Sequence, residues 1–391
     1  MNDSGSKYDE KAGYKSKNRY IVGPVKRFDQ KDTMFNRPRW DSSVKDLAPG
    51  IYGVLPVKNR DGFTLMDRAL QNSLWYLEMA FAHGHFVHGT DIYSWEKKPH
   101  SDCMRSPETP KLDVPDPAVM SRQVKKVAKL LGADMVGICE LDSRWIYSDW
   151  FNLGTCESGV MELPETCRYA IAVIVEMDYG MFKTSPTEIM GAASGLGYSK
   201  MAFIVGSLAH FIRNLGYTAI PSGNDTGLNI PIAVDAGLGE LGRNGLLITP
   251  RFGPRVRIAK VLTDLPLVPD KPVESGAAEF CDICGICAEQ CPSKAIQKGE
   301  RSSEPLNMST NPGVMKWPVD AEKCFSFWSS NNSSCGNCIR VCPFNKPDTA
   351  FHRMVRWHVK HLPQFDRFYR WMDEVSGFGK KIKAESWWNN D

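Results

Sequence analysis

Residues 280–296, FCDICGICAEQCPSKAI, hold four cysteines, and a proline follows the last of them. Cys281, Cys284, Cys287 and Cys291 have the spacing C-x2-C-x2-C-x3-C-P, which is one of the ligand patterns of [4Fe–4S] clusters. In that pattern the first three thiolates bind one cubane, whereas the fourth points toward a second cluster. A second set of cysteines is therefore expected further along the chain.

The second set begins at Cys324, reads C-x10-C-x2-C-x3-C-P and ends at Pro343. Because the fourth ligand of each run crosses over to the other cluster, the two runs predict two mixed ligand sets. These sets are Cys281, Cys284, Cys287 and Cys342 for one cluster, and Cys291, Cys324, Cys335 and Cys338 for the other. Zinc also binds C-x2-C pairs, but two runs that both end in x3-C-P favour iron–sulfur clusters.

The composition limits the remaining possibilities. Eight of the twelve cysteines fall in these two runs, which favours metal ligation over a disulfide framework. A length of 391 residues allows two or three packed units, and a net charge of +3 is too near neutral to indicate a nucleic-acid partner. The sequence has no apolar run of membrane-spanning length, and its polar N-terminus lacks the apolar core of a secretion signal. We therefore expect a cytoplasmic protein or one whose leader has been removed.

Hydrophobic periodicity suggests the domain organisation. Apolar residues at helical spacing from Pro117 to Gly132, the β-branched runs ADMVGICEL and RYAIAVIVEM, and a helical stretch from about Thr187 to Leu215 alternate along the chain. NIPIAVDAGLGELGRNGLLI and RVRIAKVLTDLPL then have strand character, so the alternation predicts an α/β sandwich. The expected parts are an irregular aromatic-rich region (1–116), this core (117–267), the two-cluster module (268–347) and a basic helical tail (348–391).

Four segments of the core are candidates for chemistry. GLGYSK places Tyr198 among small residues, and PSGND is a turn that carries Asn224. RFGPRVRIAK places Arg255 and Arg257 at alternate positions, and DAGLGELGRNG is a glycine-rich loop where backbone can approach a large ligand. Each also has an ordinary explanation, because a helical tyrosine usually packs, such glycines usually turn, and strand arginines are usually solvated or paired.

Taken together, GLGYSK, PSGND, AGLGELGRNGLLITPRFGPRVR and the double cluster motif with CFSFW resemble the respiratory corrinoid reductive dehalogenases, over residues 117–347. The resemblance implies an α+β protein in which a nitroreductase-like α/β sandwich binds cobalamin and carries an appended bacterial-type two-[4Fe–4S] ferredoxin module. It also implies a corrinoid bound base-off, and the D-x-H-x-x-G motif of folds that ligate cobalt through histidine does not occur in the sequence.

The resemblance assigns roles to individual residues. Tyr198 matches the tyrosine that gives a proton to the carbon losing halide. Free tyrosine titrates near pH ~10, so a nearby cation is expected to assist by stabilising phenolate. Arg257 is given that role and Asn224 orients the substrate or the phenol, although Arg255 could exchange roles with Arg257 because both side chains would point the same way.

Further residues are expected to line the ligands. The substrate pocket is expected to include Trp328, from the insertion FSFWSSNNSS after Cys324, together with Phe35, Trp40 and Trp75. The expected cobalamin contacts are Ser222, Gly237, Gly239, Gly242, Asn244 and Arg255.

The implied function is reductive dehalogenation of a small chlorinated aliphatic compound, in which R–Cl, two electrons and a proton give R–H and chloride. An aromatic pocket favours chloroalkanes and leaves chloroethenes open. The resemblance further implies a small membrane-anchor protein and an electron donor from the quinone pool or a hydrogenase chain, and it is compatible with a homodimer. It places the protein on the outer face of the cytoplasmic membrane after twin-arginine export, although no twin-arginine leader is visible in this chain.

Two alternative functions fit parts of the pattern. Epoxyqueuosine reductase is a related, cobalamin-dependent enzyme with two clusters that acts on tRNA, and it would need a basic RNA-binding surface and usually a helical-repeat C-terminus. A non-catalytic electron-transfer subunit would need the clusters but not Tyr198, Asn224 and Arg257.

Two more segments have more than one interpretation. HGHFVH brings His83, His85 and His88 together, as in a metal site, a contact with the corrinoid rim or a packed loop. The tail segment FHRMVRWHVKHLPQFDRFYRWM is amphipathic and basic, which fits either a surface helix that closes the core or a face toward a membrane or a membrane-anchored partner.

Overall fold

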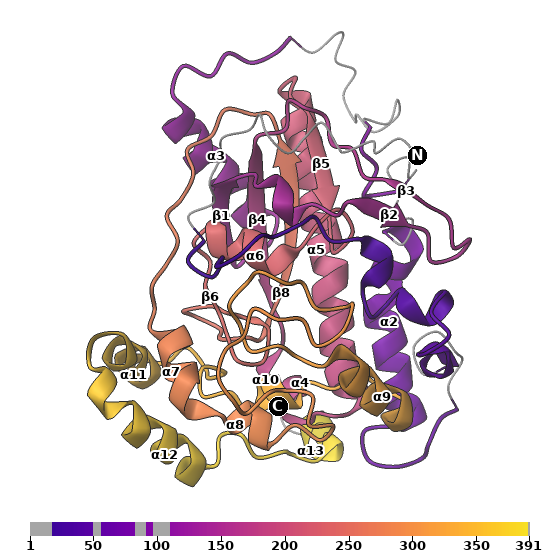
Figure 1. The fold of residues 1–391 in the computed structure, drawn as a ribbon, viewed down its shortest axis with the longest axis vertical. Coiled ribbons are helices and arrows are strands. Elements are labelled where there is room, and N and C mark those ends of the chain that lie inside the picture. Colours follow the sequence, from indigo (N-terminus) through magenta and orange to yellow (C-terminus); the bar gives the residue numbers. More distant parts are fainter. Residues whose placement is uncertain (1–17, 50–55, 83–90, 97–109, 390–391) are drawn as a thin grey trace.

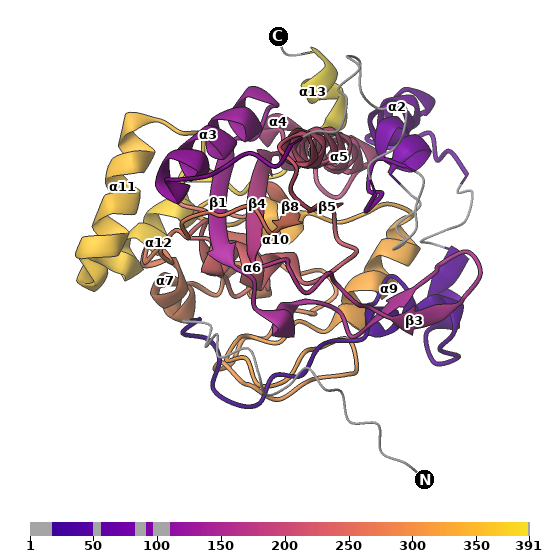
Figure 2. The ribbon, with the colours of Figure 1, turned by 90° about the horizontal axis from the view of Figure 1, so that it is seen from above.

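The computed structural model describes residues 18–49, 56–82, 91–96 and 110–389. Its centre is a four-stranded sheet in the order β1-β4-β8-β5, in which all neighbouring strands are antiparallel. The strands are β1 (Met135–Glu140), β4 (Tyr169–Glu176), β8 (Val256–Thr263) and β5 (Ala219–Ser222). Figure 2 shows this sheet between a layer that contains α3 (Pro117–Leu130) and α5 (Glu188–Asn214) and a smaller layer formed by α6 (Asn229–Asp235).

The two faces of the sheet bury separate apolar cores. On one face Ala259 and Val261 of β8 pack with Ile204 and Leu208 of α5. On the other face Leu262 packs with residues of α6. Because side chains alternate along a strand, Arg257 belongs to the α5 face and Lys260 to the α6 face. This alternation decides which residues can reach each helix layer.

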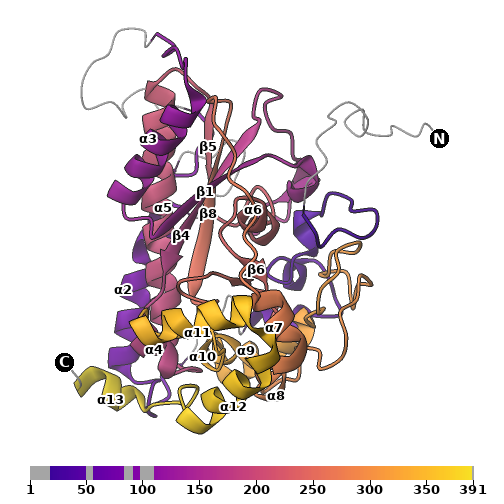
Figure 3. The ribbon, with the colours of Figure 1, turned by 90° about the vertical axis from the view of Figure 1, so that its left-hand side faces the viewer.

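The long helix α5 packs against strands β4, β5 and β8 of the sheet and contributes many residues to the apolar core on that face. Thr187 caps it, accepting a hydrogen bond from the backbone N–H of Met190, and many of its residues are buried on several sides. α2 (Leu65–Phe81) packs along α5, and the two helices run side by side in Figure 3. The expectation that residues 1–116 are irregular is therefore wrong for Leu65–Phe81. The capping box of Thr64 and Asp67 in TLMD starts this helix.

The other sequence expectations for the core are largely confirmed. The helix from Pro117, both buried strands and the long helix occur within two residues of the expected ends. The prediction of a strand at NIPIAVD is wrong, because Asn229–Asp235 forms the helix α6. In the rest of that segment, only two residues on each side of the glycine-rich turn pair as strands. The His83, His85 and His88 cluster lies outside the described residues.

The cysteine-rich module lies at one end of the core, where Figure 1 shows α7, α8, α9 and α10 beneath the sheet, with α11 and α12 at its outer side. The helices of this part are α7 (Ala277–Cys284), α8 (Ile286–Glu289), α9 (Ala321–Asn331), α10 (Asn337–Arg340), α11 (Ala350–His361), α12 (Asp366–Ser376) and α13 (Ala384–Asn389). Three of these helices, α11, α12 and α13, lie after residue 347, where the sequence predicts a basic helical tail.

Short elements complete the described chain. They are β2 (Asp149–Phe151), β3 (Ser158–Val160), α4 (Tyr179–Lys183), β6 (Glu240–Leu241), β7 (Leu247–Ile248) and 3-10 turns at Gln30–Asp32, Arg37–Arg39, Lys45–Leu47, Ser143–Trp145 and Pro363–Phe365. Among the helices described here, none combines the length and apolarity needed to cross a membrane.

Candidate functional site

Tyr198 lies in the middle of α5, and its ring is held between two side chains from other elements. Trp75 of α2 stacks on it with ring centroids 4.9 Å apart, and the Arg257 guanidinium lies 4.6 Å from its centroid. The glycines of GLGY make room for both, because a Cβ at Gly195 would lie 2.3 Å from the Trp75 ring and one at Gly197 would lie 2.8 Å from Arg257 Cγ. The small residues around Tyr198 therefore have a packing reason.

The polar contacts of Tyr198 set the direction of its hydroxyl. Asn224 Nδ2 donates a hydrogen bond to the Tyr198 oxygen at 2.7 Å, so that oxygen accepts and its own hydrogen remains available. Asn224 is exposed, whereas Tyr198 and Arg257 are half-buried, so solvent reaches the place where the three meet. Arg257 is fixed by a 3.0 Å hydrogen bond from its Nη2 to Ser194 Oγ. A cation and an amide donor on one phenol are suited to stabilise phenolate.

Arg255 has different surroundings. Its Nε donates to Asn345 Oδ1 at 2.8 Å, and Nη1 forms an ion pair with Glu176 at 2.7 Å. The side chain is only 2% exposed. Of the two arginines that the sequence left interchangeable, the structure brings Arg257 to Tyr198, while Arg255 joins the core to the cysteine-rich module. Any contact of Arg255 with cobalamin remains a prediction.

A buried lysine behind Asn224 was missed in the sequence. Lys260 has no exposed surface, and its ammonium donates to the carbonyls of Gly223 (3.0 Å) and Gly227 (3.2 Å) and to Asn229 Oδ1 (2.8 Å). Burial lowers its pKa to about 7, opposed by the negative charge of Asp225. A lysine in the middle of the otherwise apolar run IAKVL was the available signal, because such a residue is rarely buried without partners.

The predicted pocket aromatics fall into separate places. Trp75 lies against Tyr198, as described above. Trp328 of α9 stacks on Phe325 at 5.0 Å, and Phe35 packs edge-on against both. Trp40 is 40% exposed and donates from Nε1 to the carbonyl of Lys31 at 2.8 Å. The structure thus brings Trp75 to the tyrosine and groups Trp328 with Phe35; their roles as pocket walls remain predictions.

The glycine-rich loop approaches protein atoms closely. A Cβ at Gly237 would lie 2.3 Å from the Lys271 carbonyl oxygen, and one at Gly239 would lie 2.4 Å from that of Ile248. At Gly242 a Cβ would meet the Ile248 side chain at 2.7 Å. Ser222 is fully buried and accepts a hydrogen bond from the Thr226 backbone. Packing against protein therefore accounts for these glycines, and contacts of this loop and Ser222 with a corrinoid remain predictions.

Side chains of the same loop hold the cysteine-rich module. Arg243 is buried and donates to four backbone carbonyls of the module, those of Cys281, Asp282, Gln297 and Gly299, at 2.9–3.1 Å. Glu240 accepts the backbone N–H groups of Ser275 and Ala277 at the start of α7. Neither side chain was selected from the sequence, where the glycines were the more conspicuous residues. The loop connects the core to the helix that carries the first cysteines.

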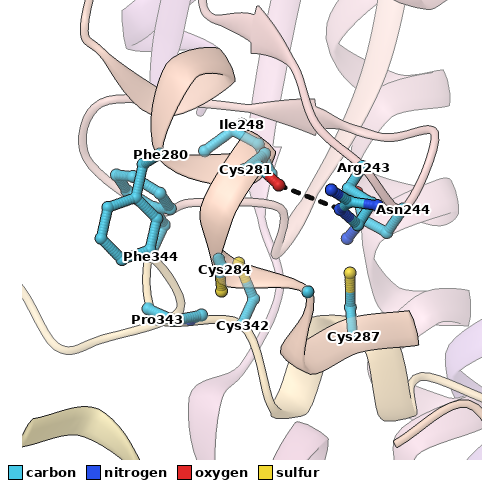
Figure 4. Close-up of a pocket in the computed structure, with 11 residues that line it drawn as sticks. Arg243, Asn244, Ile248, Phe280, Cys281, Cys284, Cys287, Cys342, Pro343 and Phe344 are labelled. Atoms are coloured by element: carbon cyan, nitrogen blue, oxygen red, sulfur yellow. Dashed lines mark hydrogen bonds between the residues drawn. The ribbon is translucent and has the colours of Figure 1, made fainter. Parts of the chain in front are cut away.

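Cysteines from both runs surround one pocket. It is lined by Cys281, Cys284, Cys287 and Cys342, with Arg243, Asn244, Ile248, Phe280, Pro343 and Phe344 around them (Figure 4). This is the mixed set that the crossover pattern predicts for one cluster, so the thiols present fit a [4Fe–4S] group. Burial raises the pKa of Cys281 to about 11, and metal binding would offset this cost by stabilising the thiolate.

The thiols of the second predicted set influence one another's pKa. Burial raises the pKa of Cys324 to about 12, with further contributions from the negative charges of Cys335 and Cys291. The pKa of the Cys338 thiol is raised well above its usual value. Burial is the largest cause, and the negative charges of Cys335, Cys324 and Cys291 follow. This set lies next to the segment that leads into α5, because the Gly336 N–H donates to Ser185 Oγ at 2.9 Å. Cys338 is also affected by Cys342, and Cys287 by Cys338, so the two predicted sets adjoin each other. Ligation by these cysteines remains a prediction.

Comparison with known proteins gives family matches for two parts of the chain. Residues 152–267 match the family described as "Reductive dehalogenase subunit", and residues 280–346 match the "4Fe-4S dicluster domain". The tetrachloroethene reductive dehalogenase of Dehalobacter restrictus is 35% identical over 390 residues, covering 84% of this chain and 70% of the relative. That of Sulfurospirillum multivorans is 31% identical over 382 residues, covering 90% and 75%.

Solved structures show the same fold. The catabolic reductive dehalogenase NpRdhA aligns over 94% of this chain with a TM-score of 0.72 and 24% identity, and this chain spans 49% of its length. The epoxyqueuosine reductase of Listeria monocytogenes is 33% identical over 131 residues, which is 33% of this chain. The long matches are thus to dehalogenases, and the tRNA-modifying enzyme matches a shorter part. The chain belongs to the reductive dehalogenase family.

Proposed function

We propose that the protein removes halide from a small chlorinated aliphatic compound at a base-off corrinoid that receives electrons through two [4Fe–4S] clusters. The observation that carries the proposal is Tyr198, with an amide donor on its oxygen and a guanidinium over its ring. Family membership and the dicluster match support it. A solved structure of the same fold is described as suggesting a mechanism for B12-dependent dehalogenation in that protein.

In this mechanism Tyr198 supplies the proton of R–X + 2e⁻ + H⁺ → R–H + X⁻. A bound corrinoid supplies low-valent cobalt for breaking the carbon–halogen bond. The Tyr198 hydroxyl hydrogen is not used by Asn224, so it is available to the carbon that loses halide. As the proton leaves, the Asn224 amide and Arg257 stabilise the phenolate. Trp75 keeps the ring in place by stacking.

Substrate class is the finer part of the proposal. The relatives from Dehalobacter restrictus and Sulfurospirillum multivorans are named tetrachloroethene reductive dehalogenases. We therefore propose chlorinated ethenes as candidate substrates, in addition to the chloroalkanes that the aromatic residues suggest. Both classes are small and apolar, as expected for a site bordered by Trp75.

The test is cofactor content followed by chloride release. Protein purified anaerobically and reconstituted with cobalamin is expected to contain about eight irons per chain, the content of two [4Fe–4S] clusters. One cobalt per chain is expected beside them. Chloride release is then measured with tetrachloroethene, trichloroethene and a chloroalkane series, with an epoxyqueuosine-containing tRNA stem-loop as the competing substrate. A full iron content without cobalt would identify an electron-transfer protein, and turnover of the tRNA alone would identify the other enzyme class.

We also propose that the protein binds an anionic lipid surface through α11 and α12. Their inward side carries Val359 and Tyr369, which pack in the apolar core of the cysteine-rich module. Ion pairs lie beside them, because Asp373 pairs with buried Lys346 at 2.6 Å and Arg370 pairs with Glu289. Large apolar side chains face outward instead, including Phe351, Met354, Trp357, Phe365, Phe368, Trp371 and Val375, each between 46% and 65% exposed. Residues 350–383 contain eight lysines and arginines and three acidic residues, a net charge of +5. Exposed tryptophans within a basic segment suit a lipid headgroup region.

Vesicle flotation tests this surface. We expect the protein to float with phosphatidylglycerol-containing vesicles, and to bind pure phosphatidylcholine vesicles and high-salt samples less, because part of the attraction is electrostatic. Trp357→Ala combined with Trp371→Ala should reduce binding about tenfold. Leu130→Ala, which removes an even more exposed apolar side chain from α3, should leave it unchanged. Absence of flotation would contradict lipid binding. The exposed apolar surface of α11 and α12 would then be assigned to a protein partner, such as the proposed membrane anchor or a second copy. Twin-arginine export and the quinone or hydrogenase donor stay proposals from the family resemblance.

A further inference from the structure

We propose that Lys260 is a positioning residue for the proton transfer, acting through Asn229 and Asn224 on Tyr198. The inference rests on the proposed role of Tyr198 as proton donor. It concerns a residue that touches neither the tyrosine nor the substrate and lies on the opposite face of the sheet from α5.

A chain of three short hydrogen bonds joins the lysine to the tyrosine. Lys260 Nζ donates to Asn229 Oδ1 at 2.8 Å. Asn229 Nδ2 donates to Asn224 Oδ1 at 2.7 Å, and Asn224 Nδ2 donates to the Tyr198 oxygen at 2.7 Å. The chain passes around the edge of the sheet, where β5 ends at Ser222 and the turn toward α6 begins.

The direction of this chain is fixed at its lysine end. An ammonium only donates, so Asn229 must turn its oxygen toward Lys260 and its NH₂ group toward Asn224. The surroundings of that NH₂ group agree, because Asn229 Nδ2 also lies 2.9 Å from the carbonyl oxygens of Gly223 and Ile258. Asn224 must then accept with its oxygen and present its NH₂ group to Tyr198.

This direction matters because an asparagine can turn either end toward a phenol. If Asn224 presented its oxygen, the Tyr198 hydroxyl would donate to it and the hydrogen would be held away from the substrate. With the NH₂ group presented, the hydrogen is free and the phenolate that follows gains a donor. Lys260 therefore selects the arrangement in which Tyr198 can act as an acid.

The lysine also holds the turn that carries Asn224. Two of its three acceptors are the carbonyls of Gly223 and Gly227, on either side of Asn224 in sequence. Burial disfavours the charged form of Lys260 and lowers its pKa to about 7. If the side chain only filled space, an apolar residue would destabilise the fold less than a buried charge does. A test has to separate this support of the turn from the effect on proton transfer.

The experiment is a double-mutant cycle between Lys260→Met and Tyr198→Phe in the cofactor-loaded enzyme. Lys260→Met keeps the length and apolar bulk of the side chain and removes its hydrogen bonds. We expect kcat to fall about tenfold with little change in KM, and the solvent deuterium isotope effect on kcat to increase, because proton transfer becomes slower. In the Tyr198→Phe background, Lys260→Met should cause no further loss.

Two further variants guard against a folding defect. Asn229→Ser interrupts the chain while leaving the ammonium with its two carbonyl acceptors, and it should give the same kinetic change. Lys316→Met is the matched control: Lys316 donates to the Asn311 carbonyl, and burial lowers its pKa to about 8, but it lies in the cysteine-rich module away from Tyr198. It should leave kcat and the isotope effect unchanged. Iron and cobalt contents and melting temperature are measured for every variant.

The outcomes are distinct. An equal loss from Lys260→Met in both backgrounds would show a structural role alone and overturn the inference, as would unchanged kcat and isotope effect in both Lys260→Met and Asn229→Ser. Full activity of Tyr198→Phe alone would instead overturn the proton-donor role itself, and the inference with it. The two failures are therefore seen in different variants.

Discussion

Tyr198→Phe should lower kcat for chloride release by about 10²–10⁴-fold, the usual contribution of a positioned general acid. The substitution removes the only proton of the Tyr198 ring that can be transferred, while the stacking on Trp75 and the cation–ring contact with Arg257 are retained. Substrate binding is therefore expected to change little, so KM should stay within about threefold of wild type. Chloride release measured at saturating reductant, with cobalt and iron content determined in parallel, checks this prediction.

A matched control uses an exposed tyrosine of α2. Tyr76 follows Trp75 on α2 but is 64% exposed and packs edge-on against Phe81. Tyr76→Phe should retain wild-type kcat. If Tyr198→Phe kept full cobalt and iron and turned over at the wild-type rate, another group would have to supply the proton. A loss of cobalt in Tyr198→Phe would point to a binding role instead.

The second large effect concerns the pairing of cysteines with clusters. In the crossed assignment, Cys284 and Cys342 bind the same cluster although they belong to different runs, and both line the same pocket. A protein with Cys284→Ala and Cys342→Ala together should therefore lose one cluster only and keep about four irons per chain. If each run instead held its own cluster, the same double variant would damage both, and iron would fall toward zero.

Iron analysis and EPR of the reduced protein distinguish these outcomes, because one unperturbed cluster signal should survive in the crossed case. Cys284→Ala combined with Cys338→Ala removes a ligand from each mixed set, and should lose both signals. Cys156→Ala is the control, since Cys156 is exposed and belongs to neither run, and it should keep about eight irons. Dechlorination should fall more than 100-fold in both double variants, because electron delivery is interrupted.

Part of the site could be predicted from the sequence, because the residues that form it are close together along the chain. The cysteine runs predict their ligand sets through fixed short spacings, and the cysteines of one predicted set surround one pocket. Tyr198 and Asn224 stood out through their small neighbours, and the structure joins them by a hydrogen bond. The long helix and the buried strands followed from periodicity, which reports burial directly.

Other parts depended on contacts that no local pattern encodes. Arg255 and Arg257 were interchangeable by alternation, but β8 begins at Val256, so Arg255 lies before the strand and its backbone N–H joins the turn from Phe252. α2 was missed although TLMD carries a capping box, because the flanking sequence looked irregular. This helix is part of the site, because it carries Trp75, which stacks on Tyr198.

The sequence by itself determined the two-cluster pattern, the α5 tyrosine and the family resemblance, because each rests on residues that are neighbours along the chain. Tertiary structure alone decided that Arg257 covers Tyr198, that the glycines of GLGY admit Trp75 and Arg257, and that hydrogen bonds through Asn229 link Lys260 to Asn224. These contacts join residues distant in sequence, and their geometry follows from how the sheet, α2 and α5 pack together.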